Sequence, residues 1–175
     1  MLTHAFQIIA VSNIDDEKKA LAVQLLSQNS GVEGMLGRQV IDLKYESESP
    51  TLKQLLSVHR LKTGALISAA CLLGCIAAGA SDVQISAASR FAYNLGIAFQ
   101  IKDDILDVVG DSNILGKPAG SDAANDKVTY VSLVGLDKAQ QDVQTLTDNA
   151  VKCLGVFENT EFLQLLADKL VNRNK

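Results

Sequence analysis

The chain has 175 residues, 47% of them hydrophobic, which is typical of one globular domain or a large part of one. Its net charge is −4 and it has no basic tract, which argues against a nucleic-acid partner. Three cysteines, an odd number without a CxxC spacing, argue against a disulfide framework or a zinc site and favour the reducing cytoplasm.

Helical patterns fill most of the chain. Only two prolines interrupt it and strand-like alternation is scarce, so an all-α fold is predicted. Thr51 is the expected N-cap of one helix and Ser81 or Asp82 that of the next, and Asp137 is a candidate cap for a fresh start within the helix over residues 129–154. In chain order, helices are expected over residues 2–9, 15–29, 31–45, 51–80, 82–109, 129–154 and 161–172.

Two segments stand out from this pattern. Residues 110–128 form a polar, glycine-rich loop, longer than most connections and therefore a candidate functional segment. Residues 63–81 carry no charge and nearly reach the length of a membrane span. Because this stretch is rich in alanine and glycine, a buried helix of an α-bundle is expected instead of a membrane helix. No capping residue precedes Leu2, which suggests that the natural start of its helix is absent.

Three carboxylates lie on one turn of the helix expected over residues 82–109. At about 100° per residue, Asp103, Asp104 and Asp107 share one face, and Gln100 lies on the same face. Carboxylates this close repel one another unless a cation or a proton intervenes. The arrangement suits Mg²⁺, which prefers one or two carboxylates together with waters and phosphate oxygens. The alternative is a solvated acidic stripe on an amphipathic helix.

Cations elsewhere in the chain could bind a phosphate held by such a metal. Lys62 and Thr63 stand where the polar half of their helix meets its apolar half, so Lys62 either faces a cavity or extends toward water. Lys117, in the polar loop, either reaches a phosphate or is solvated. Gln39 and Asp42 are three residues apart, which by itself indicates a surface pair.

The order of these motifs is more specific than any one of them. Five segments follow one another along the chain: GMLGRQVIDL, HRLKTGAL, FQIKDDILDVVGD, LGK and KVTY. In this order they strongly resemble the trans-isoprenyl diphosphate synthases, and most closely the bacterial farnesyl diphosphate synthase (geranyltranstransferase) group. The resemblance implies an antiparallel helical bundle of the isoprenoid synthase type. It makes residues 1–175 the C-terminal portion of a single domain whose N-terminal helices are missing.

The resemblance also implies roles for individual residues. The family's second aspartate-rich motif, which binds Mg²⁺, matches Asp103, Asp104 and Asp107. Contacts with the substrate diphosphate are implied for Lys62, Thr63, Gln100 and Lys117.

Three further positions match residues of the substrate sites. Phe99 corresponds to the aromatic residue beside the homoallylic substrate, Gln39 to the glutamine of the GGQ motif, and Lys127 to the lysine of the GKxTYP motif. Catalytic roles are implied for Lys62, Asp103 and Lys117.

The implied reaction is a Mg²⁺-dependent prenyl transfer. An allylic diphosphate (geranyl or dimethylallyl) ionises, the double bond of isopentenyl diphosphate attacks the cation, and loss of a proton gives farnesyl diphosphate. Metal and lysines stabilise the departing diphosphate. The implied protein is a cytoplasmic homodimer without a membrane span.

Parts of the family pattern are missing or altered. The first aspartate-rich motif is absent from the 175 residues, and Arg38 and Pro118 depart from the usual residues. Two functions therefore stay open. One is an enzyme, acting alone or with a partner that supplies the missing half. The other is a catalytically incomplete helical remnant or subunit, which binds Mg²⁺-diphosphate weakly or binds only a protein partner.

Overall fold

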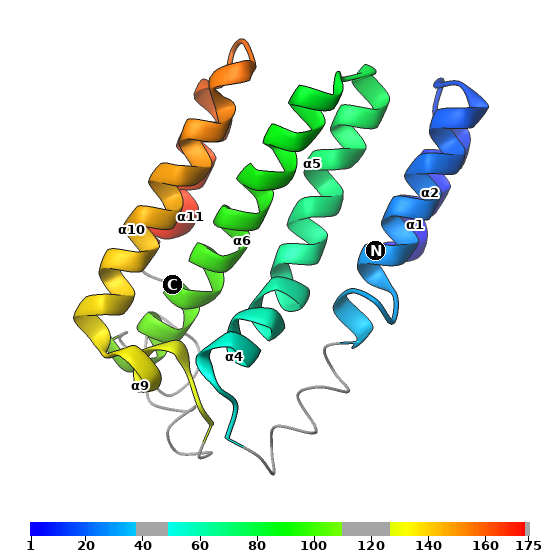
Figure 1. Ribbon diagram of the computed structural model, residues 1–175. Helices are drawn as coiled ribbons and strands as arrows, with labels where there is room; N and C mark the ends of the chain where they lie inside the picture. Colours follow the sequence, from blue (N-terminus) through cyan, green and yellow to red (C-terminus); the bar gives the residue numbers. More distant parts are fainter. Residues whose placement is uncertain (38–48, 110–126, 174–175) are drawn as a thin grey trace.

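The computed structural model describes residues 1–37, 49–109 and 127–173, and within these ranges the chain is helical without any strand. Four helices stand side by side in one layer (Figure 1). In spatial order they are α2 (Asp16–Ser30), α5 (Ala65–Ala78), α6 (Asp82–Val109) and α10 (Leu136–Cys153). Behind this layer, α1 (Leu2–Val11) packs on α2, and α11 (Glu161–Val171) packs on α10. The all-α class expected from the sequence is confirmed.

Three helices begin at polar residues that satisfy their first backbone N–H groups. The Asp15 carboxylate accepts the N–H of Lys18 at 2.8 Å at the start of α2. Thr51 and Gln54 form a reciprocal capping box before α4 (Leu52–His59). Ser81 and Gln84 exchange the same pair of bonds before α6, so Ser81 caps this helix.

The single helix expected over residues 51–80 is divided by a wider turn. Between α4 and α5 the backbone forms a π-helical turn, η1 (Arg60–Gly64). Such turns are rare and often occur at functional sites. Helix α5 ends at Gly79, whose φ of +68° is a left-handed conformation that glycine adopts without strain.

The helix expected over residues 129–154 is also divided. A short helix, α9 (Tyr130–Val134), ends at Gly135, where φ is +84° and ψ is 159°. This backbone conformation lies outside the helical region, so α10 begins in a new direction, with Asp137 in its first turn. A turn of 3₁₀-helix, η2 (Leu154–Val156), then leads toward α11.

The apolar core lies mainly between α6 and α10. Leu95, Ile101 and Leu154 are fully buried there, next to Val143. The outer helices are far less covered. No residue of α1 is buried in the described structure, and on α11 the side chains of Phe162 and Leu165 are 72% and 53% exposed.

One continuous helical stretch, Leu52–Ala78, is long and apolar enough to cross a membrane by length and composition alone. It packs against α2 and α6 as a member of the bundle. Only 22% of its most apolar window is buried within the described structure. This burial is lower than expected for the buried bundle helix that the sequence predicts.

Several sequence expectations fall on residues 38–48 and 110–126 and so lie outside the described residues. They include most of the helix expected over residues 31–45 and nearly all of the polar loop. The predicted site residues Gln39 and Lys117, and the departures Arg38 and Pro118, belong to the same two segments.

Candidate functional site

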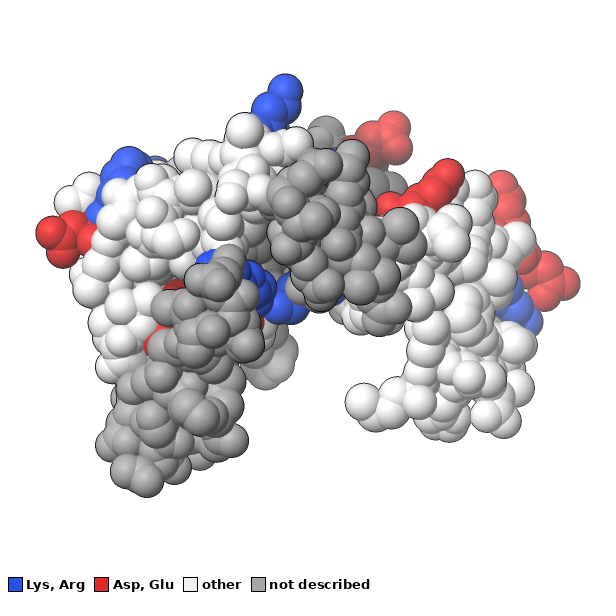
Figure 2. All heavy atoms as spheres, turned by 90° about the horizontal axis from the view of Figure 1, so that it is seen from below, with Lys and Arg blue, Asp and Glu red and all other residues white. Residues whose placement is uncertain are grey.

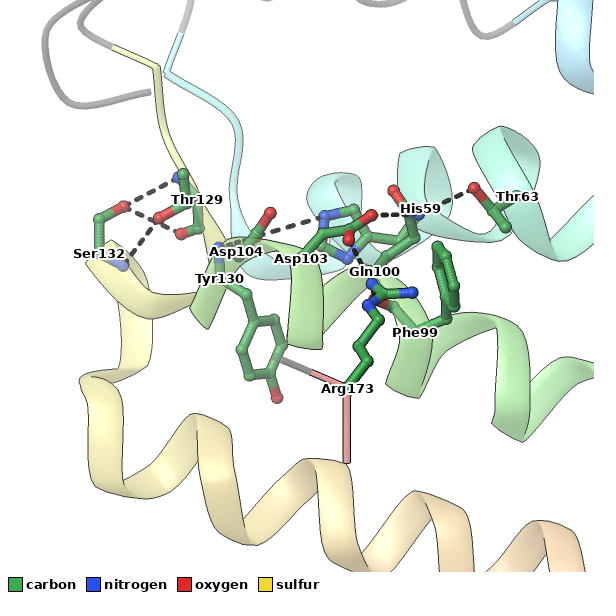
Figure 3. A network of polar contacts seen from close by, with 10 residues as sticks. All are labelled: His59, Thr63, Phe99, Gln100, Asp103, Asp104, Thr129, Tyr130, Ser132 and Arg173. Atoms are coloured by element: carbon green, nitrogen blue, oxygen red, sulfur yellow. Dashed lines mark hydrogen bonds and ion pairs between the residues drawn. The ribbon is translucent and has the colours of Figure 1, made fainter. Parts of the chain in front are cut away.

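The candidate site lies at one end of the helical layer, where four separate parts of the chain come together (Figure 3). The last turns of α6 carry Gln100, Asp103 and Asp104. Beside them are the π-helical turn η1, the start of α9 and the segment that follows α11. Residues more than seventy positions apart in the sequence therefore contribute side chains to one polar cluster.

A hydrogen-bonded path joins η1 to the acidic turn. The Gln100 side-chain amide donates to the Thr63 hydroxyl oxygen at 2.8 Å and to Asp103 Oδ2 at 3.3 Å. Gln100 is only 2% exposed, so its amide is fixed by these partners and not by water. Lys62 precedes Thr63 in the same turn. Thr63 from one predicted motif and Asp103 from another are thus joined through the Gln100 amide.

Gly96 allows this contact. Gly96, one turn before Gln100, faces Gly64 at the end of η1, and a Cβ atom on Gly96 would lie 2.6 Å from the Gly64 Cα. The backbones of η1 and α6 therefore touch at this point, a closeness that only glycine permits. The short separation brings the Thr63 hydroxyl within hydrogen-bonding distance of Gln100.

The Asp104 carboxylate turns toward α4 and α9. Its Oδ2 accepts the backbone N–H of Tyr130 at 2.7 Å and lies 3.6 Å from His59 Nε2, an electrostatic contact longer than a hydrogen bond. Asp104 and His59 are 9% and 5% exposed. Thr129 and Ser132 form a capping box at the start of α9. The Asp104 carboxylate therefore also satisfies a backbone donor of this short helix.

Asp103 has a different partner, Arg173, which follows α11. The Arg173 guanidinium forms an ion pair with Asp103 Oδ1 and donates to the Phe99 carbonyl oxygen at 3.2 Å. It also lies 3.6 Å from the centre of the Phe99 ring, a cation–π contact. The Arg173 side chain is 15% exposed and that of Asp103 is 43% exposed.

The three aspartates differ in their readiness to bind a metal. Asp107 is 2% exposed and Asp104 is held by Tyr130, whereas Asp103 reaches the surface. Among the residues that the structure describes, no three His, Cys, Asp or Glu side chains lie close enough to hold a metal together. The oxygen donors fit a Mg²⁺ ion that takes one or two carboxylates and completes its shell with phosphate and water. They do not form an all-protein cage. Binding by all three aspartates stays a prediction.

Burial and charge shift the pKa values of neighbouring groups. Burial lowers the pKa of Arg173, and the charge of Asp103 partly opposes this change. Burial also lowers the pKa of Lys102, and the positive charge of Arg173 adds to the effect. At the edge of the site, burial raises the pKa of the Tyr130 hydroxyl to about 12, helped by its hydrogen bond to Asp142 at 2.9 Å.

The other predicted residues are placed as follows. Phe99 lies beneath Arg173, and Lys62 is partly exposed within η1. Lys127 is exposed, three residues before Tyr130. Seen from below, the molecule is arched, and basic side chains gather near the middle of the hollow (Figure 2).

A separate open groove of about 300 Å³ lies between α2, η1 and α6. Arg60, Ser68 and Tyr93 are among its lining residues, and Gly64 also borders it. None of the acidic-turn residues line this groove, so it is distinct from the polar cluster.

Sequence reasoning missed Arg173 and His59. His59 lies four residues before Thr63, and this helical spacing could have indicated a shared face. Arg173 lies seventy residues from Asp103, and no local pattern connects them. The one available signal was the need of a partly buried acidic cluster for a counter-charge.

A helical layer with an acidic turn, a Lys-Thr pair and a buried glutamine at one end defines an all-α protein with one polar, charged end. The chain belongs to the polyprenyl synthetase family, whose profile matches residues 1–163. The farnesyl diphosphate synthase of Micrococcus luteus is 42% identical over 178 residues, covering 100% of this chain and 60% of that protein. The geranylgeranyl diphosphate synthase of Cyanophora paradoxa is 35% identical, covering 99% of this chain and 59% of that protein.

Solved structures agree with this assignment. The chain resembles a geranyltransferase from Helicobacter pylori, crystallised with magnesium and isoprenyl diphosphate, with a TM-score of 0.78 and 30% identity. The match covers 97% of this chain and 56% of that structure. The chain thus spans about three fifths of the length of the curated relatives it matches.

Proposed function

We propose that this chain forms part of a prenyltransferase that joins isopentenyl diphosphate to an allylic diphosphate. The contact of Thr63, Gln100 and Asp103 carries the proposal, because it joins two predicted diphosphate-binding motifs in one hydrogen-bonded cluster. Membership of the polyprenyl synthetase family supports it.

In this proposal the residues act by charge and position. Asp103, with Asp104 and Asp107 as further candidates, holds Mg²⁺, which supplies positive charge for the leaving diphosphate. Lys62 and Lys117 contribute positive charge to the same leaving group, and Thr63 and Gln100 orient it. Gln39, Phe99 and Lys127 border the bound substrates. The allylic carbon–oxygen bond breaks, a carbon–carbon bond forms to isopentenyl diphosphate, and one proton is lost to the released pyrophosphate.

We propose farnesyl diphosphate as the product, made from geranyl or dimethylallyl diphosphate. The relatives include both farnesyl and geranylgeranyl diphosphate synthases, so the assay must separate products by chain length. The purified chain is incubated with isopentenyl diphosphate, geranyl diphosphate and Mg²⁺, and the extracted products are separated by chromatography. We expect farnesyl diphosphate from the wild type and none from Asp103→Asn or Lys62→Ala. Wild-type product of another chain length would overturn the farnesyl assignment.

A second candidate function is favoured by the uncovered outer helices. The chain spans about three fifths of its relatives, and Phe162 and Leu165 on α11 are exposed. A helical subunit that completes its site with another polypeptide would have these features. The test adds the unmatched part of the Micrococcus luteus enzyme as a separate chain. Product formed only by the mixture supports the subunit, whereas full activity of the chain alone contradicts it.

A homodimer and a cytoplasmic location belong to the same proposal. The reduced state expected for the three cysteines supports the location. Sedimentation of the purified chain tests the first, and fractionation of the producing cell tests the second.

A further inference from the structure

We infer that Arg173 is the internal counter-ion of Asp103, and that a divalent cation must displace it to bind this carboxylate. The inference deepens the proposed function, on which it rests for the expectation that a divalent cation binds here. Its own basis is the placement of the guanidinium at the acidic turn (Figure 3).

Arg173 is held by more than a surface ion pair. Its guanidinium contacts the Phe99 ring at 3.6 Å, donates to the Phe99 carbonyl at 3.2 Å and pairs with Asp103 Oδ1. With 15% of the side chain exposed, solvent screens these contacts only in part. Stacking on an aromatic ring and a planar set of donors are specific to arginine, so the geometry is that of a fixed cation.

The Arg173 guanidinium binds the same carboxylate that a divalent ion would need as a ligand. Asp103 Oδ1 accepts from Arg173, and Oδ2 accepts from the Gln100 amide. A divalent ion bound to this carboxylate would share it with the guanidinium, and two cations on one carboxylate repel each other. Asp103 can therefore serve one of the two cations well, but not both. Arg173 offsets the repulsion among the acidic residues while no metal is bound.

A purely structural role for Arg173 predicts a different outcome. If the guanidinium only anchored the segment after α11 and oriented Asp103, its loss would disorder the carboxylate and weaken cation binding. A counter-ion competes, so its loss strengthens cation binding. The sign of the change in affinity thus separates the two roles.

The experiment measures Mn²⁺ binding to the full chain without diphosphate, by the electron paramagnetic resonance signal of free Mn²⁺. Mg²⁺ competition follows in the same samples. We expect Arg173→Met, which removes the charge and keeps much of the volume, to bind Mn²⁺ about fivefold more tightly than wild type. Arg173→Lys keeps the charge but not the planar donors, and its affinity for Mn²⁺ should lie between those of wild type and Arg173→Met. Circular dichroism checks that helix content is unchanged.

Two controls place the effect at Asp103. Arg90→Met removes an exposed arginine of α6 about 20 Å away along the helix, and it should change the affinity by less than about twofold. In an Asp103→Asn background, Arg173→Met should no longer tighten binding. The double change isolates the coupling between the two residues.

Weaker or unchanged Mn²⁺ binding by Arg173→Met would overturn the inference, as would an equal gain in the Asp103→Asn background. Absence of any Mn²⁺ binding in wild type and variants would overturn it too. If the predicted affinity series holds while prenyl transfer is absent, the counter-ion role stands and the proposed reaction fails. The two proposals are therefore tested separately.

Discussion

Gly96 shows how one missing side chain sets the geometry of the candidate site. The backbones of α6 and η1 touch because Gly96 carries no Cβ atom, whereas a Cβ atom on Gly64 would meet its neighbours only at 3.7 and 4.0 Å. The contact lies one turn from the Thr63–Gln100 hydrogen bond. Any widening of this crossing moves the Lys-Thr pair away from the acidic turn. Stability and site geometry therefore both depend on Gly96.

Gly96→Ala should destabilise the protein by about 1–3 kcal/mol, because the new methyl group would lie 2.6 Å from a backbone atom that cannot move alone. Urea unfolding followed by circular dichroism measures the loss. Gly74→Ala is the matched control on α5, since a Cβ there meets nothing within 4 Å. It should be neutral or stabilising by up to about 1 kcal/mol. Equal losses for both changes would contradict the close crossing.

Tyr130 predicts a dependence of stability on alkaline pH. Its pKa is raised from 10.0 to about 12 by burial and by the hydrogen bond to Asp142. Because the raised value belongs to the folded state, the stabilisation is complete below pH 10 and is lost as the pH rises toward 12. The loss should amount to no more than about 2.5 kcal/mol. Comparing the unfolding free energies of wild type and Tyr130→Phe over this pH range isolates the effect. If the two free energies change with pH in parallel, Tyr130 does not cause the loss.

At the scale of helices, the break between α9 and α10 matters most. Gly135 has φ +84° and ψ 159°, a region that residues other than glycine occupy only with strain. The break ends α9 after a single turn. The first N–H group of this short helix, that of Tyr130, donates to Asp104, so α9 supplies the partner of one aspartate of the acidic turn.

Gly135→Ala should destabilise the protein by about 1–3 kcal/mol even though its Cβ would meet nothing within 4 Å, because the penalty is conformational. Gly155→Ala is the control, since that site is equally open and its φ is not positive. Thermal or urea unfolding of the two variants gives the comparison. A loss for Gly155→Ala as large as that for Gly135→Ala would argue against backbone strain as the cause.

Much of the helical arrangement could be predicted because its signals are local. Asp15, Thr51 and Ser81 act as caps within three residues of the groups they satisfy, and the ends of α2, α6 and α11 lie within two residues of expectation. The π-helical turn η1 was not predicted, because the residues on both sides of it have the same helical pattern. Asp137 did signal a fresh start within the helix expected over residues 129–154, and the break lies two residues earlier, at Gly135.

The candidate site was predictable to a similar degree. The contact of Thr63 with Gln100 follows from motifs that the resemblance joins. The separate partners of Asp103 and Asp104 do not, because helical periodicity places three acidic residues on one face without specifying what faces each of them. Arg173 and Tyr130 reach that face from helices distant in the sequence.

At the scale of the whole molecule, α11 presents apolar side chains that the described structure leaves uncovered. Phe162 and Leu165 are one turn apart, 72% and 53% exposed. Exposed neighbouring apolar residues favour association with another surface.

We expect the purified chain to self-associate in a concentration-dependent manner, and Phe162→Ser with Leu165→Ser to reduce this association. Sedimentation velocity at several concentrations measures it. Val32→Ser removes a single apolar side chain that is 81% exposed beyond α2, and it should have no effect. Association of the double variant equal to that of wild type would exclude α11 as the contact surface.

The distance in sequence between Asp103 and Arg173 has a consequence for how the protein is made. Synthesis proceeds from the N-terminus, so α6 is made before Arg173, which lies seventy residues after Asp103. During that interval the carboxylates of α6 lack the guanidinium that later offsets their charge. If Asp103 binds a divalent cation as proposed, that cation can reach the carboxylate before Arg173 does.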